Sequence, residues 1–230
     1  RTLTQLIRQY PRCYTFLFEP QPNHAFIGAT PELLVRTHSH EIESMGLAGS
    51  IQRGATAAGD TQLADELLAS AKDRSEHDLV VTALRRRLQP LTTSLEISAT
   101  PEILALSNIQ HLYTPVRGEL THADGVLPLV ETLHPTPALG GSPREQALAF
   151  IDATEPVPRG WYAAPVGWID SDMDGSFAVA IRSAVAQQQR VWLYAGAGIV
   201  ADSVPDKEWE ETGWKFRPML DALGVEPLNH

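Results

Sequence analysis

The sequence predicts an α+β fold built around a large antiparallel sheet. Short β-rich runs separated by turn-forming residues occupy residues 13–45 and return from residue 177 onward. Between them and near the C-terminal end lie stretches in which apolar residues recur three and four positions apart, a spacing typical of helices. Strands and helices do not alternate as regular βαβ units, and no long linker or internal repeat divides the chain. One domain covering residues 1–230 is therefore expected.

The N-terminal half of the chain is predicted to begin with strands and to continue as helix. The four predicted strands are residues 13–18, 25–27, 33–36 and 41–45. A helical stretch follows from about Thr61 to Leu88, and Pro90 ends it because proline cannot continue a helix.

The C-terminal half is predicted to hold two helices and a hairpin. The first helix covers residues 142–153, with Ser142 as N-cap and Pro143 at the first helical position. Residues 177–185 and 191–196 are predicted to form the hairpin, preceded by a turn at residues 172–175. The last helix runs from about residue 206 to 223 and is amphipathic. Its predicted apolar face consists of Trp209, Phe216, Leu220 and Leu223.

Composition argues against several classes of protein. With 18 basic and 28 acidic residues the net charge is −10, which opposes nucleic-acid binding, and Arg85–Arg87 suit a solvated helix face. The single Cys13 and the lack of zinc-ligand spacing favour a reducing, cytoplasmic setting. No apolar run approaches the roughly 20 residues that span a bilayer, so no membrane association is expected. The start at Arg1 is typical of an interior point of a longer chain.

Two pairs of acidic residues on predicted helices suggest a metal site. Glu208 and Glu211 lie three apart on the last helix, and Asp73 and Glu76 repeat that spacing in the long helical stretch. Like charges at this spacing repel by a few tenths of a kcal/mol, which a shared divalent cation would reverse. Magnesium fits because it prefers oxygen ligands and needs few protein carboxylates. The alternative is two solvated pairs, with Glu211 and Lys215 forming a surface ion pair.

Two further segments are candidates for ligand binding. Arg182 falls in the predicted strand 177–185, where alternation places it beside small alanines that leave room for a carboxylate. A guanidinium on a half-exposed sheet face is the alternative. Residues 196–201 (GAGIVA) match the dinucleotide fingerprint, but Pro205 interrupts the required helix and too little chain follows. Paired glycines there indicate close backbone approach to a ligand, or a tight turn.

Taken together and in order, several segments resemble the chorismate-utilising enzymes, and among them the isochorismate synthases. The segments are residues 26–34 (FIGATPELL), 47–50 (LAGS), 70–77 (SAKDRSEH), 133–139 (LHPTPAL), 166–170 (VGWID), 180–182 (AIR), 195–205 (AGAGIVADSVP) and 208–215 (EWEETGWK). Each is a weak signal alone, but their combination and order are specific. The resemblance implies stacked antiparallel sheets with helices outside and a buried site for chorismate and Mg²⁺.

The resemblance also implies roles for individual residues. Glu76 and Glu211 match direct metal ligands, Asp73 and Glu208 match their acidic neighbours, and Glu32 matches the general acid. Burial near other acids would keep Glu32 protonated, whereas the alternative is a glutamate that merely starts a strand. The positions that match substrate contacts are Gly49, Ser50, His134, Ala138, Ile181, Arg182, Tyr194, Ala197, Gly198 and Lys215. On the residues alone, His134 would be taken as structural.

The sequence departs from the family pattern at the general base. That base is a lysine on a strand upstream of the Glu32 segment, and the only lysines here are Lys72, Lys207 and Lys215, which fall in other motifs. A missing N-terminal segment of the same chain is therefore expected to supply it. Residues 1–230 alone are expected to bind Mg²⁺ weakly and not to turn over.

Other functions remain open at this point. The fold would equally suit a salicylate, anthranilate or aminodeoxychorismate synthase, although residues 134–138 and 166–170 are more like those of isochorismate synthases. A non-catalytic subunit that keeps the scaffold is the alternative from another class. Menaquinone, a catechol siderophore and salicylate are all possible destinations of the isochorismate.

Overall fold

Two antiparallel sheets form the framework of the protein in a computed structural model, which describes residues 1–225. The four-stranded sheet has the order β1-β2-β10-β11, with β1 Tyr14–Gln21, β2 His24–Thr30, β10 Ser183–Gln187 and β11 Arg190–Tyr194. The seven-stranded sheet has the order β5-β7-β4-β3-β9-β8, and β6 pairs with β7. Its strands are β3 Leu33–His38, β4 Glu41–Gln52, β5 Thr92–Ile97, β6 Glu102–Ala105, β7 Ile109–Leu120, β8 Pro165–Ile169 and β9 Gly175–Val179. The α+β prediction is confirmed.

Helices cover these sheets. They are α1 Thr2–Gln9, α2 Ala57–Ala69, α3 Ala71–Leu88, α4 Val126–Leu133, α5 Pro137–Gly140, α6 Arg144–Thr154 and α7 Pro205–Leu223, with a 3₁₀ turn η1 at Gln89–Leu91. None of the helices within residues 1–225 is long and apolar enough to cross a bilayer.

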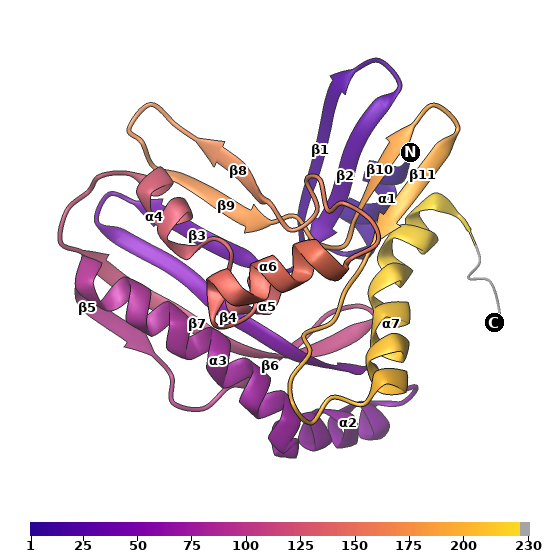
Figure 1. Ribbon diagram of the computed structural model, residues 1–230, viewed down its shortest axis with the longest axis horizontal. Coiled ribbons are helices and arrows are strands. Elements are labelled where there is room, and N and C mark those ends of the chain that lie inside the picture. Colours follow the sequence, from indigo (N-terminus) through magenta and orange to yellow (C-terminus); the bar gives the residue numbers. More distant parts are fainter. Residues whose placement is uncertain (226–230) are drawn as a thin grey trace.

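Each sheet has its own hydrophobic core. Long helix α3 lies against the seven-stranded sheet (Figure 1), and its Leu84 and Leu88 are buried with Ile42 of β4 and Val35 of β3. A second core joins α1 and α7 to the four-stranded sheet through Leu6, Ile27, Ala184 and Met219. Apolar burial therefore fixes α3 and α7 on different sheets, and the site depends on how these two sheets meet.

The chain crosses between the two sheets at two adjacent places. It passes from β2 to β3 through Pro31 and Glu32, and it returns from β9 to β10 through residues 180–182. The crossings are hydrogen-bonded to the strands beside them, because Ala29 N donates to Arg182 O at 3.2 Å and Val179 N donates to Glu32 O at 3.0 Å. Glu32 and Arg182 thus both lie at the seam of the sheets.

The predicted single strand over residues 177–185 is wrong. Arg182 adopts a φ of 51°, a left-handed conformation that breaks the strand and turns the chain into the other sheet. The observed hairpin is therefore β10–β11, and the turn near residues 172–175 belongs to β8 and β9. An arginine held in this strained region needs support from its surroundings, which is a property often found at functional sites.

Two predicted helix boundaries also need correction. The stretch 61–88 is two helices, α2 and α3, because the Ser70 hydroxyl accepts from Asp73 N at 3.3 Å and starts a new helix. The helix predicted over residues 142–153 begins at Arg144, with Pro143 at its N-cap and no side-chain cap from Ser142. The other predicted strands and the final helix occur near their expected places, with β4 extending beyond residue 45 to Gln52.

The predicted orientation of the last helix is wrong. Trp209 is 74% exposed, and Phe216, Leu220 and Leu223 are only half-buried. The buried residues of α7 are Glu208, Glu211, Lys215, Pro218, Met219 and Ala222. Helical spacing places Glu208 and Glu211 together on one face of α7. This acidic face is buried because Glu208 forms an ion pair with Lys72 of α3.

Candidate active site

The buried acid Glu32 lies at the seam of the sheets. It is 3% exposed, and the Thr136 hydroxyl donates to its Oε1 at 3.5 Å. Burial raises the pKa of Glu32 from 4.5 to about 7, although the positive charges of Arg182 and Lys215 and the Thr136 hydrogen bond oppose the change. Glu32 is therefore an acid that holds its proton near neutral pH and lies within electrostatic reach of two cations.

Arg182 is held by a histidine that the sequence did not indicate. Arg182 is 6% exposed, and its Nη2 lies 3.1 Å from His111 Nε2. Burial and the charge of Arg182 hold the pKa of His111 well below its usual value, so the ring is neutral and its Nε2 accepts from the guanidinium. His111 Nδ1 then carries the proton and donates to Gly49 O at 3.1 Å, with Ser50 Oγ 3.0 Å away.

A bulge in β4 brings the backbone of Gly49 close to α3. The β4–β7 register shifts between Ala48 and Ser50, and Gly49 has a φ of 75°. A side chain there would be strained, and its Cβ would lie 3.0 Å from Asp73 Cβ. The predicted substrate positions Gly49 and Ser50 therefore lie between His111 and the start of α3.

Acidic side chains of α3 and α7 meet around Lys72. The Lys72 Nζ lies 3.3 Å from Glu76 Oε2 on its own helix and 2.9 Å from Glu208 Oε1 on α7. Burial raises the pKa of Glu76, Lys72 opposes this, and the negative charge of Glu211 raises it further. The four acids that the sequence analysis paired by spacing therefore form one charged group across two helices.

Lys215 and a glycine loop close the other side of this group. Lys215 pairs with Glu211 one turn earlier on α7 and donates to Gly196 O at 2.9 Å. Gly198, two residues further along the loop, approaches the Glu76 carboxylate so closely that an added Cβ would collide with it. The loop backbone thus closely approaches a side chain of α3, and its close approach to a ligand stays a prediction.

Tyrosines lie beside the same loop. Tyr194, at the end of β11, stacks on Tyr162 with ring centroids 5.5 Å apart. Burial raises the pKa of Tyr162, whose hydroxyl also faces Gly196. No sequence motif with a chemically informative spacing contains Tyr162 or His111. These two residues are recognised as part of the site only from the folded structure.

Three other predicted residues take supporting positions. Ala138 on α5 and Ile181 pack in or against the larger hydrophobic core. His134 ends α4 half-buried, and its carbonyl accepts a hydrogen bond from Arg144 at 2.5 Å. The segment that contains His134 still contacts the site, because two residues further along the Thr136 hydroxyl donates to Glu32.

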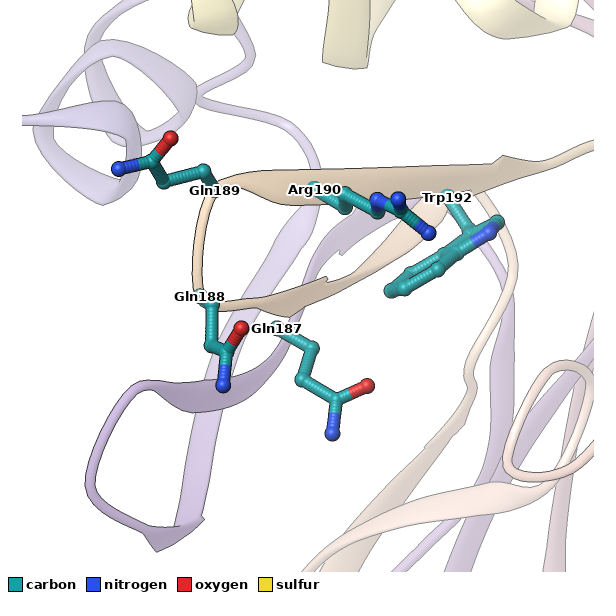
Figure 2. A pocket seen from close by; sticks show the side chains of 5 residues that line it. All are labelled: Gln187, Gln188, Gln189, Arg190 and Trp192. Atoms are coloured by element: carbon teal, nitrogen blue, oxygen red, sulfur yellow. The ribbon is translucent and has the colours of Figure 1, made fainter.

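A surface pocket elsewhere lacks comparable chemistry. It lies at the end of the β10–β11 hairpin and is lined by Gln187, Gln188, Gln189, Arg190 and Trp192 (Figure 2). Arg190 is the single charged residue of the five, so the pocket offers no acid–base pair. The buried charges around Glu32 and Glu76 are therefore the better candidate for a catalytic site.

Comparison with known proteins identifies the family. Residues 1–224 match the family model described as chorismate binding enzyme. The chain belongs to this family.

Several proteins similar to this chain are isochorismate synthases. It is 49% identical over 203 residues to the salicylate biosynthesis isochorismate synthase of Pseudomonas aeruginosa, covering 88% of this chain and 43% of that protein. It is 43% identical to isochorismate synthase MenF of Bacillus subtilis, covering 97% and 47%. A crystal structure of a Bacillus anthracis protein assigned as DhbC, a 2,3-dihydroxybenzoate-specific isochorismate synthase, superposes with a TM-score of 0.94 at 40% identity, covering 98% and 61%. The chain spans about half the length of the curated relatives it matches.

The acidic group around Lys72 has the oxygen donors that a divalent cation prefers. Its oxygens come from two helices, and Glu208 Oε2 is buried without a hydrogen-bond partner among the described residues, 1–225. Across residues 1–225, however, no three acidic, histidine or cysteine side chains are gathered as a metal-binding group. The ammonium groups of Lys72 and Lys215 contact these carboxylates instead. The residues fit Mg²⁺ by charge and ligand type, provided that the carboxylates regroup around it.

Proposed function

We propose that this chorismate-binding chain forms the catalytic part of an isochorismate synthase, which converts chorismate into isochorismate with Mg²⁺. The relatives at 43–49% identity bear that name. The structural observation that carries the proposal is the buried acid Glu32, whose pKa burial raises to about 7 and which lies within electrostatic reach of Arg182 and Lys215. This arrangement suits a dicarboxylate substrate that loses a hydroxyl group.

In the proposed reaction Glu32 is the general acid. Water forms a bond to C2 of the substrate ring and gives one proton to the general base expected on the upstream strand, the bond from C4 to its hydroxyl oxygen breaks, and the double bonds shift between them. A hydroxyl is a poor leaving group, and protonation by Glu32 lets it depart as water. With a pKa of about 7, Glu32 carries its proton in about half of the molecules at neutral pH, whereas an ordinary glutamic acid would be almost fully ionised.

Two cations and several backbone groups are proposed to receive the carboxylates of the substrate. Arg182 offers a planar guanidinium whose orientation His111 fixes, and Lys215 offers an ammonium held by Glu211 and Gly196 O. The backbone of Gly49, in the bulge of β4, and those of Ala197 and Gly198, between β11 and α7, are proposed to take part as well. Tyr194 and Ile181 are proposed to line the ring pocket.

Glu76 and Glu211 are proposed as the metal ligands, with Asp73 and Glu208 as their neighbours. When bound, Mg²⁺ supplies positive charge that orients and neutralises the C1 carboxylate. No lysine of this sequence stands where the general base is expected, on a strand upstream of Glu32, because Lys72 lies on α3 and Lys207 and Lys215 lie on α7. We therefore propose that residues 1–230 alone do not turn over.

The test compares products by chromatography after incubation with chorismate and Mg²⁺. A longer protein that carries this chain and a lysine-bearing upstream strand should form isochorismate, and Glu32→Gln should lower its kcat by about 10²–10⁴-fold. Glu19→Gln, at an exposed glutamate, is the matched control and should leave kcat unchanged. Release of pyruvate with an aromatic acid would instead assign a salicylate synthase. Isochorismate made by residues 1–230, verified by intact mass, would contradict the missing base.

A further inference from the structure

Lys72 occupies a central position that the proposed reaction leaves unexplained. Its ammonium contacts three carboxylates, Glu208 at 2.9 Å, Glu76 at 3.3 Å and Asp73 at 3.6 Å. Two of these lie on α3 and the third lies on α7 (Figure 1), so the lysine joins the two helices where the metal site is proposed.

We propose that Lys72 is a built-in competitor of the divalent cation. Its ammonium holds Glu76 and Glu208 before the metal binds, and it has to leave the Glu76 carboxylate when that carboxylate becomes a ligand. This inference rests on the proposed function, because it takes Glu76 as a metal ligand. If Lys72 competes in this way, the site binds Mg²⁺ more weakly than the carboxylates alone would. Occupancy of the site by Mg²⁺ is then coupled to the position of the Lys72 side chain.

An independent observation indicates that Lys72 does not satisfy every carboxylate oxygen around it. Glu208 is 7% exposed and reaches Lys72 through Oε1, yet its other oxygen, Oε2, is buried without a partner. A buried acceptor without a partner is costly, and a cation or its water would satisfy it. The net charge of the group also suits a divalent cation. Four carboxylates and two ammonium groups leave a charge of −2, which one divalent cation balances.

Lys72 is better suited to move than Lys215. The Lys72 side chain is 20% exposed, compared with 11% for Lys215, and its polar partners within residues 1–225 are all side chains. Lys215 is additionally anchored by its hydrogen bond to the backbone oxygen of Gly196. Lysine has a flexible stem, so Lys72 reaches water with little disturbance of α3.

Contacts with acids keep Lys72 charged in the absence of the metal. Its ammonium lies 2.9 Å from Glu208, 3.3 Å from Glu76 and 3.6 Å from Asp73, and carboxylates this close favour the charged form of a lysine. The lysine therefore acts as a cation at neutral pH.

The test is calorimetric titration of MgCl₂ into the wild-type chain and Lys72→Met. The affinity of Lys72→Met should rise by about tenfold, which lies within the usual range for coupling between two ligands of one site. Lys207→Met removes an exposed lysine of α7 and should leave the affinity unchanged. Unchanged or weaker binding by Lys72→Met would overturn the inference.

Glu211→Gln separates this inference from the proposed metal site. If Glu211→Gln loses Mg²⁺ binding while Lys72→Met binds like wild type, the site stands and the competition is wrong. If Glu211→Gln binds Mg²⁺ like wild type, or none of the proteins binds it, the proposed site itself fails, and the inference fails with it.

A measurement on the wild-type chain removes dependence on the folding of a variant. Brief acetylation followed by mass spectrometry should modify Lys72 several-fold faster at saturating Mg²⁺ than without it, because the displaced ammonium reaches water. Lys207 should react equally in both conditions. Equal or slower modification of Lys72 with Mg²⁺ would contradict its displacement.

Discussion

At the residue scale, the protonation of Glu32 links chemistry to stability. Its pKa is raised to about 7 in the folded chain, so the folded state binds the proton more tightly than the unfolded state does. The stabilising contribution is fully present below pH 4.5, the ordinary pKa of the group, and it is lost as the pH rises through about 7.

We expect Glu32→Gln to remove this pH dependence. Between pH 4.5 and 8 the free energy of unfolding of the wild-type chain should fall relative to Glu32→Gln by about 3 kcal/mol. Glutamine keeps an acceptor for the Thr136 hydroxyl, so packing is conserved. Urea unfolding at a series of pH values measures the difference, and parallel curves for the two proteins would show that Glu32 titrates normally.

Arg182 should tune the same acid. Its charge is the largest of the influences that lower the pKa of Glu32, so Arg182→Met should raise that pKa further. Carbon-13 NMR of the Glu32 carboxyl group reports the titration midpoint directly. Arg36→Met, which removes an arginine paired with Glu43, is the control and should leave the midpoint in place. A midpoint that falls in Arg182→Met would contradict the proposed electrostatics.

Residue spacing predicted the acids better than it predicted their partners. The pairs Asp73/Glu76 and Glu208/Glu211 follow from helical periodicity, which survives folding because it is local. The contact of Arg182 with His111 joins residues 71 positions apart, and His111 lies on β7, a strand that was not predicted. Long-range contacts of this kind depend on sheet topology, which no local pattern contains.

At the element scale, the loop between β11 and α7 is expected to matter through one glycine. Gly198→Ala places a Cβ against the Glu76 carboxylate, which is the flexible end of a side chain. The free energy of unfolding should therefore change by less than about 1 kcal/mol, whereas Mg²⁺ affinity should fall by about tenfold. Calorimetry measures the affinity, and thermal denaturation measures the stability.

Gly213 on α7 is the matched control for Gly198. An added Cβ there meets no atom within 4 Å, so Gly213→Ala should stabilise the chain by about 0.5–1 kcal/mol through its helical preference. Mg²⁺ affinity should stay the same. Equal affinities for the Gly198→Ala and wild-type chains would show that the loop does not confine Glu76.

The inward face of α7 gives a further prediction. Met219 is 1% exposed in the core with Leu6 and Ile27, so Met219→Ala should lower the free energy of unfolding by about 2–5 kcal/mol. Trp209 is 74% exposed, and Trp209→Ala should change the free energy of unfolding by no more than about 0.5 kcal/mol. A larger loss of unfolding free energy for Trp209→Ala in chemical denaturation would mean that the apolar face predicted from the sequence is the buried one.

The error on α7 has a physical cause. An amphipathic pattern identifies two faces, but it assumes that the apolar face is the buried one. Here the N-terminal half of the helix buries Glu208 and Glu211 because Lys72 and Lys215 compensate their charges. Buried charge of this kind is exceptional in ordinary cores, and its presence is itself an indication of function.

At the scale of the whole molecule, the site exists because two sheets share a seam. The fold class followed from alternating strand patterns and helical periodicity. β1 to β4 and β11 lie near predicted strands, whereas β5, β6 and β7 were not predicted. The break at Arg182 was not predicted either, because the apolar residues on both sides of Arg182 and Ser183 read as one continuous strand and hide a left-handed residue and a change of sheet. Glu32 and Arg182 are brought together by this break, and the acids of α3 and α7 are brought together by the packing of their helices on different sheets.

The central claim is that Glu76 and Glu211, 135 positions apart in the sequence, hold one cation together. A double-mutant cycle of Mg²⁺ binding by calorimetry tests it most directly, with Glu76→Gln, Glu211→Gln and the double variant. Each single variant should lose most of the affinity, and the double variant should lose little more, because one removed ligand already disables the shared site. Losses that add independently, or a single variant that binds like wild type, would contradict a common cation.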